Sequence, residues 1–114
     1  MKIQYLEIVS PEADSICKTY EDVHGLDFSE PVAVLGNART ADLPDDSTLA
    51  VRGPLRSNET PVVRPYFLVE DIDASIAKAA EAGAEIAIPS MEIPGYGTCA
   101  IFILGGIEHA LWQV

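Results

Sequence analysis

At 114 residues, of which 48% are hydrophobic, the chain has the length of one domain and enough apolar side chains to bury a core. Its 18 acidic side chains outnumber 7 basic ones, and the formal net charge of −11 repels phosphate backbones and anionic lipid headgroups. No apolar run approaches the ~20 residues that a membrane-spanning helix needs. We therefore expect neither nucleic acid nor a membrane as a partner.

The start of the chain and its two cysteines indicate a cytoplasmic protein. Gln4 and Glu7 interrupt the first apolar stretch, which is too broken for the core of a signal peptide. Cys17 and Cys99 form no C-x-x-C pair, and each lies in an apolar pattern, so we interpret both as small buried hydrophobic residues. In the cytoplasm we expect no disulfide between them.

The first half of the chain predicts a strand, a helix and then three short strands. Ile3–Val9 has strand composition with partial alternation. Ser10 and Pro11 predict the start of a helix, and Gly25 is typical of its left-handed end. Three segments after Gly25 have strand character and are separated by turn residues: Val32–Leu35, Ala38–Asp42 and Thr48–Val51.

The second half predicts the same order of elements after a linker at about residues 54–61, which is rich in turn residues. Val62–Glu70 is the next predicted strand, and Asp71 is placed to cap a helix that Gly83 closes. Three more strands are expected at Glu85–Ile88, Thr98–Leu104 and Ile107–Val114.

The two predicted helices also share a sequence motif. Ser15-Ile16-Cys17-Lys18 with Glu21 returns as Ser75-Ile76-Ala77-Lys78 with Glu81, each time after a predicted strand and before a glycine. An internal repeat of this kind indicates two structural copies. We therefore expect one domain over residues 1–114, with one module at about 1–53 and a second at about 62–114.

Four segments carry a resemblance to a known family: Thr19–Leu26, Arg64–Ala74, Ile93–Gly97 and Ala110–Gln113. In this order they resemble the vicinal oxygen chelate superfamily, which includes glyoxalase I, bleomycin resistance proteins and extradiol dioxygenases, and above all its small single-domain glyoxalase-like members. The resemblance implies an α+β fold in which tandem βαβββ modules form a cupped, mostly antiparallel eight-stranded sheet. It also implies helices on the convex face, a small-molecule ligand on the concave face and a homodimer.

Strand alternation then selects the side chains that would line the concave face. The first strand would place Leu6 and Ile8 under the helix and leave Tyr5 and Glu7 toward the ligand. Applied to the fifth and last strands, the same rule brings Arg64, Tyr66, Glu108 and Trp112 to this face, and Arg52 joins them if its strand turns it inward. We predict Glu7, Arg64 and Glu108 as catalytic residues and Tyr5, Arg52, Tyr66 and Trp112 as ligand-binding residues. In these roles an arginine would hold an oxygen anion and a glutamate would move a proton.

Two of these charged residues have a simpler interpretation. An ion pair of Arg64 with Glu7 or Glu108 would satisfy both partners and would need no ligand.

A metal centre is not expected. Metal-dependent members of the superfamily use His, Gln or Glu, whereas the matching positions here hold Tyr5, Arg64 and Ala110. A fixed guanidinium charge repels a dication. A register shifted by two residues would substitute Glu7, Tyr66 and Glu108 and would still supply no histidine.

Three functions remain open at this point. The clustered Arg and Glu favour an enzyme, for example a lyase, isomerase or hydroxylase, that acts on an oxygen-bearing metabolite. A metal-dependent enzyme with an atypical divalent-metal site is a variant of this alternative. The missing metal ligands favour a metal-free protein that binds and sequesters a planar aromatic compound. A ferredoxin-like interaction module without a deep cup is the third alternative.

Overall fold

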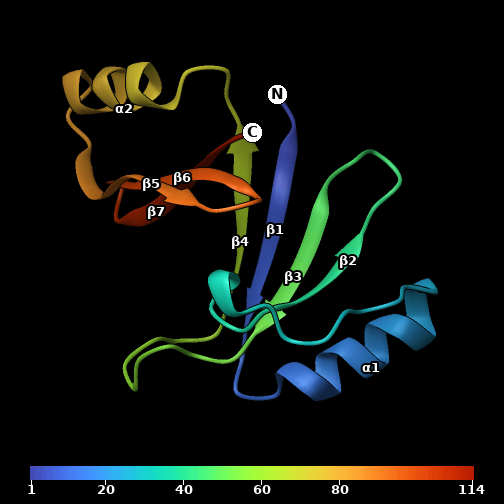
Figure 1. Cartoon of the computed structure of the whole chain (residues 1–114). Coiled ribbons are helices and arrows are strands. Elements are labelled where there is room, and N and C mark those ends of the chain that lie inside the picture. The colour runs from blue at the N-terminus through green and yellow to red at the C-terminus, as the bar shows by residue number, and fades with distance from the viewer. The chain divides into compact units, whose positions relative to one another are not determined.

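The computed structural model describes residues 1–114. The fold is α+β, with seven strands and two α-helices (Figure 1). The chain divides into two compact units: unit 1 contains Met1–Gln4 and Pro65–Val114, and unit 2 contains Tyr5–Arg64. No helix has the length and hydropathy that crossing a membrane requires.

Unit 2 has a small mixed sheet covered on one face by a helix. The strands are β1 (Ile3–Val9), which begins in unit 1, β2 (Arg39–Asp42) and β3 (Thr48–Arg52). β3 lies between the other two, parallel to β1 and antiparallel to β2. The helix α1 (Ala13–His24) packs on β3. Leu6 and Ile8 lie in the core with this helix, as the alternation predicted.

Unit 1 repeats this plan with a longer sheet. Its strands are β4 (Val62–Leu68), which begins in unit 2, β5 (Glu85–Ile93), β6 (Gly97–Leu104) and β7 (Ile107–Gln113). They lie in the order β4-β7-β6-β5, with β4 parallel to β7 and the other pairs antiparallel. The helix α2 (Ile72–Glu81) packs on β5, β6 and β7 (Figure 1). As expected, the Asp71 side chain caps α2 by accepting from the Ala74 amide at 3.1 Å.

The prediction of an eighth strand at Val32–Leu35 is wrong. Ala33–Leu35 forms a 3₁₀ turn, η1, and Val32 keeps an isolated bridge to Ala38. The cause is local, because Gly36 and Asn37 both adopt left-handed backbone angles with φ of 68° and 63°. Their amides bond back to Ala33 and Val32, which folds the segment on itself before a strand can form.

Two element boundaries also differ from the prediction. α1 begins two residues after the predicted start, because Ser10 accepts from the Glu12 amide in a turn that precedes the helix. β5 continues through Pro89 to Ile93, beyond the predicted end at Ile88. Since β5 pairs on one side only and has two register shifts, the proline removes no ladder hydrogen bond that the strand needs.

Candidate functional site

A cluster of buried charged side chains lies on the strand face of unit 2 opposite α1. Glu7 stands in β1 between Leu6 and Ile8, so alternation turns it away from the helix. Arg52 ends β3, and Arg64 lies in the part of β4 that belongs to unit 2. Glu7 and Arg52 are 5% and 6% exposed, which makes them the most deeply buried charged residues of the chain.

Glu7 joins the two arginines. Its Oε2 accepts from Nε of Arg52 at 2.9 Å, and its Oε1 accepts from Nη1 of Arg64 at 2.5 Å. The side chain of Arg64 is 11% exposed. Buried charges of this kind are tolerated only when each has a partner, because the loss of hydration must be offset by ion pairing and hydrogen bonds. The cluster therefore supports the fold as well as any chemistry.

A fourth member, Glu59, reaches the cluster from the loop between β3 and β4. Its two oxygens accept from Nη1 and Nη2 of Arg52, both at 2.9 Å, in the paired geometry typical of arginine and carboxylate. Arg52 Nη1 also donates to the Gly53 carbonyl at 3.1 Å, and the Leu55 amide donates to Glu59 Oε1 at 2.8 Å. Two guanidinium groups thus meet two carboxylates, and the charges of the cluster balance.

The ion pair of Arg52 and Glu59 changes how both groups ionise. Burial alone would lower the pKa of Arg52, but hydrogen bonds with Glu59 and the charges of Glu7 and Glu59 raise it above its ordinary value. The hydrogen bonds from Arg52 lower the pKa of Glu59 to about 2, although its own burial acts in the opposite direction. Both side chains therefore stay charged throughout the physiological pH range.

The structure brings together three of the predicted site residues in direct contact: Glu7, Arg52 and Arg64. The ion pair of Arg64 with Glu7 is the partnership that the sequence offered as one of two choices. Tyr5, at 4% exposed, lies two residues before Glu7 on the same strand. Glu108 is exposed and belongs to β7 in unit 1.

The two predicted aromatic ligand-binding residues pair with each other in unit 1. The rings of Tyr66 and Trp112 lie 5.7 Å apart with an interplanar angle of 87°, an edge-to-face contact. They come from the parallel neighbours β4 and β7, where Tyr66 is in register with Ala110 and Trp112 with Leu68. With 7% and 3% exposed, both rings take part in the core of unit 1.

Sequence reasoning missed Glu59. The residue lies in the segment predicted as a linker, seven positions after Arg52, and no periodic pattern connects it with a strand. Its role depends on how the loop turns back, which is fixed by contacts such as the bond between its carboxylate and the Leu55 amide. The one signal available was an acidic residue close in sequence to a strand-ending arginine.

The residues at the metal positions of the superfamily do not fit a divalent cation. Arg64 directs a guanidinium nitrogen at the Glu7 carboxylate, and Ala110 has no donor atom in its side chain. No group of three or more His, Cys, Asp or Glu side chains is placed to hold a metal ion. The expectation that no cofactor is used stays a prediction.

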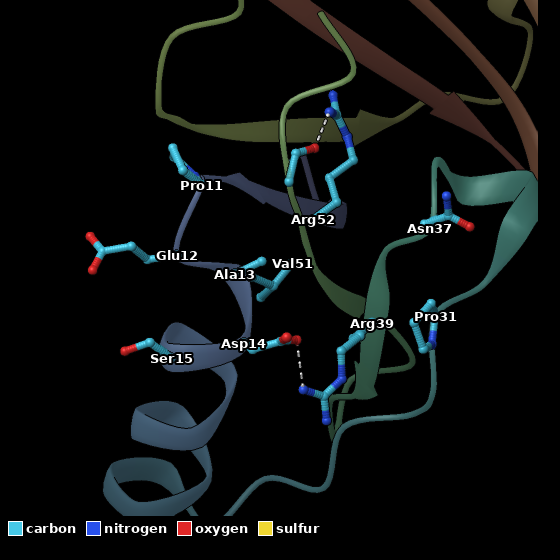
Figure 2. A pocket seen from close by; sticks show the side chains of 11 residues that line it. Pro11, Glu12, Ala13, Asp14, Ser15, Pro31, Asn37, Arg39, Val51 and Arg52 are labelled. Atoms are coloured by element: carbon cyan, nitrogen blue, oxygen red, sulfur yellow. Dashed lines mark hydrogen bonds and ion pairs between the residues drawn. The ribbon is translucent and has the colours of Figure 1, made fainter. Parts of the chain in front are cut away.

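A cavity of about 340 Å³ lies at the start of α1, also within unit 2 (Figure 2). Arg39 Nη1 contacts Asp14 Oδ1 there at 3.2 Å, and Figure 2 shows the two side chains pointing toward one another. Arg52 forms part of the wall and is the one predicted site residue among those that line the cavity. The cavity thus touches the charge cluster at Arg52.

Comparison with solved structures finds the same fold in other proteins at low sequence identity. A hypothetical protein from Bacillus halodurans has a TM-score of 0.78 at 12% identity, over 99% of this chain and 94% of that one. Methylmalonyl-CoA epimerase from Mycobacterium tuberculosis has a TM-score of 0.75 at 15% identity, over 96% and 85% of the two chains.

The epimerase from Streptomyces coelicolor in complex with 2-nitronate-propionyl-CoA has a TM-score of 0.74 at 18% identity, over 99% of this chain and 96% of that one. No protein-family model matches the sequence, and no curated protein matches it. At these identities the likeness shows the fold. The chain has the fold of methylmalonyl-CoA epimerase, which is a member of the vicinal oxygen chelate superfamily that the sequence motifs resemble.

Proposed function

We propose that the protein is a small-molecule enzyme of isomerase type that moves a proton on an oxygen-bearing metabolite. Glu7 acts as the base, and Arg64 holds the oxygen on which negative charge develops. The observation that carries this proposal is the contact of 2.5 Å between the two side chains, both largely buried. Enzymes of this type need a carboxylate and a fixed cation within reach of one substrate, inside a site that excludes water.

The proposed step removes a proton from the carbon next to a carbonyl group. Glu7 takes the proton, the electron pair of the C–H bond forms a carbon–carbon double bond, and the carbonyl oxygen becomes an enolate oxygen beside Arg64. Return of a proton to the opposite face of the same carbon, with re-formation of the carbonyl group, completes the turnover.

The substrate class we propose is an acyl thioester of coenzyme A. Support comes from structures of the same fold, namely methylmalonyl-CoA epimerase bound to 2-nitronate-propionyl-CoA or to methylmalonyl-CoA. The hydrogen on the carbon beside a thioester carbonyl is acidic enough for a glutamate to remove when a cation stabilises the enolate. A lyase or hydroxylase reaction has no comparable support.

Further elements of the sequence prediction belong to the same proposal. Tyr66 and Trp112 would supply flat apolar contact to the ligand, Tyr5 a hydroxyl, and Glu108 a second carboxylate. The proposal also includes a cupped sheet with helices on its convex face and a homodimer. Light scattering coupled to size-exclusion chromatography tests the homodimer, because it measures the mass of the assembly.

The test follows proton exchange directly. The protein is incubated with methylmalonyl-CoA in D₂O, and ¹H NMR follows loss of the hydrogen at the carbon between the two carbonyl groups. We expect exchange far above the rate without protein, and loss of that excess in Glu7→Gln. No exchange above background on any 2-substituted acyl-CoA would contradict the proposal.

One observation favours a second function, metal-free binding without turnover. Both oxygens of Glu7 already accept hydrogen bonds from arginines, an arrangement that would also serve to hold the sheet together. In this case Tyr66 and Trp112 would bind a planar aromatic compound. A ligand recovered chemically unchanged, at one molecule per chain and without proton exchange, would support sequestration.

A further inference from the structure

The loop from Gly53 to Pro61 is fastened to the strands through one carboxylate. Residues 54–58 and 60–61 are exposed, whereas Glu59 turns inward and has only 10% of its side chain exposed. Its oxygens bind Arg52 on the sheet, and one of them also accepts the Leu55 amide of the loop. Release of the Glu59 carboxylate would therefore leave the bond to the Gly53 carbonyl as the hydrogen bond between Arg52 and the loop.

The position that Glu59 occupies has the geometry of a carboxylate-binding site. Arg52 presents Nη1 and Nη2 side by side, and each donates to a different oxygen at 2.9 Å. A planar guanidinium recognises a free carboxylate in the same paired way. The Nε of Arg52 is meanwhile held by Glu7, which fixes the plane of the group. The site is thus already oriented, and a carboxylate of the protein itself occupies it.

Charge balance decides which ligand can take this position. The cluster of Glu7, Arg52, Glu59 and Arg64 is neutral, and burial makes any uncompensated charge costly. A ligand carboxylate that replaces Glu59 keeps the balance, because Glu59 then moves into water with its charge. A neutral ligand or a cation would leave Arg52 and Arg64 with Glu7 as the one carboxylate of the cluster. Since the pKa of Glu59 is about 2, protonation does not vacate the site near neutral pH.

We propose that Arg52 is the binding site for a carboxylate of the small-molecule ligand and that Glu59 occupies it when no ligand is bound. Entry of the ligand displaces Glu59 and releases the part of the loop that Glu59 holds, including the Leu55 amide. Arg52 and Gly53 also form part of the wall of the cavity of about 340 Å³ at the start of α1, whereas Glu59 does not line it (Figure 2). The inference rests on the proposed function in that the ligand is a small anionic metabolite.

Occupation of the site by Glu59 lowers its apparent affinity for an external carboxylate. Glu59 is a competitor attached to the same chain, and such groups act at effective concentrations of about millimolar or more. The apparent affinity for an external carboxylate equals the intrinsic affinity multiplied by the fraction of molecules in which Glu59 has left the site. Removing the Glu59 carboxylate should therefore strengthen carboxylate binding by roughly tenfold or more.

Sodium acetate is the probe, with sodium chloride at equal ionic strength as the reference. Binding is followed by the thermal midpoint and by amide exchange at Leu55 in wild type, Glu59→Ala and Glu59→Gln. Glu59→Gln provides a variant of nearly the same shape if the alanine variant does not fold. Glu30→Ala removes an exposed carboxylate from the same unit and measures the general effect of net charge.

We expect acetate to stabilise the Glu59 variants at roughly tenfold lower concentration than wild type, with Glu30→Ala resembling wild type. In wild type, acetate should speed exchange of the Leu55 amide, because its acceptor is displaced. Equal or weaker acetate binding in both Glu59 variants, or unchanged Leu55 exchange in wild type saturated with acetate, would overturn the inference. Neither the thermal midpoint nor the Leu55 exchange depends on turnover. Failure of the proton-exchange test would therefore not affect the carboxylate-binding result, and failure of the acetate test would not affect the proton-exchange result.

Discussion

Replacement of Glu59 by glutamine tests the energetic account of the charge cluster. The substitution keeps the shape of the side chain and removes its charge. In the folded protein the pKa of Glu59 falls from 4.5 to about 2, with hydrogen bonds from Arg52 as the main cause. One pKa unit corresponds to about 1.4 kcal/mol, so the ionised carboxylate stabilises the folded state by about 3 kcal/mol at pH 7. The free energy of unfolding of Glu59→Gln should be lower than that of wild type by this amount.

The sign of the pH dependence follows from the direction of the shift. A carboxylate with a lower pKa in the folded state stabilises the protein above its unfolded pKa, and this contribution is lost as pH falls toward the folded pKa. For Glu59 the loss begins near pH 5 and continues to about pH 2. The glutamine variant has no group that titrates at this position. The difference between the two proteins should therefore shrink from about 3 kcal/mol at pH 7 to about 1 kcal/mol at pH 3.

Urea unfolding followed by circular dichroism at pH 7, 5 and 3 measures this difference. Glu30→Gln is the control, because Glu30 is exposed and its replacement should change stability by less than about 0.5 kcal/mol. A difference between wild type and Glu59→Gln that stays constant from pH 7 to pH 3 would refute the assignment of the stability to ionised Glu59.

Three further predictions concern Glu7 in the same cluster, the cap of α2 and the packing of β6 on β7. Glu7→Gln leaves two buried arginines with one carboxylate fewer, and we expect a loss of about 3–5 kcal/mol in urea unfolding; a loss below about 1 kcal/mol would contradict the burial of these charges. Asp71→Ala removes the cap of α2 and should cost about 0.5–2 kcal/mol, whereas Asp73→Ala, in the same turn, should cost less by the same measurement. Gly97→Ala would place a methyl group 2.5 Å from the Gln113 carbonyl oxygen at a residue whose backbone φ is 153°. We expect this substitution to lower the free energy of unfolding by about 1–3 kcal/mol. A thermal midpoint equal to that of wild type would show that β6 and β7 are not packed as described.

Periodicity in the sequence predicted much of the fold and part of the site. Alternation in β1 placed Leu6 and Ile8 under α1 and Glu7 on the opposite face, and the structure confirms both placements. The ion pair of Glu7 with Arg64 was one of two predicted choices. These features follow from local patterns, because a strand with one buried face fixes where each of its residues points.

Features that depend on loop conformation could not be predicted in the same way. The eighth strand was expected from the apolar character of Val32–Leu35, but two left-handed residues after it close a 3₁₀ turn. Glu59 lies in a segment without periodicity. Its inward position depends on the conformation of the loop, which the residues next to it in the sequence do not predict. The site was therefore found through its strand residues, while its loop residue was missed.

Deuterium exchange on a 2-substituted acyl-CoA by wild type and Glu7→Gln tests the central claim most directly. Circular dichroism first establishes the folded fraction of each protein, since the variant is expected to be less stable. We predict exchange by wild type and a decrease of about 100-fold or more in folded Glu7→Gln, as for loss of a general base. Exchange by the folded variant at the wild-type rate would contradict the assignment of Glu7 as the base.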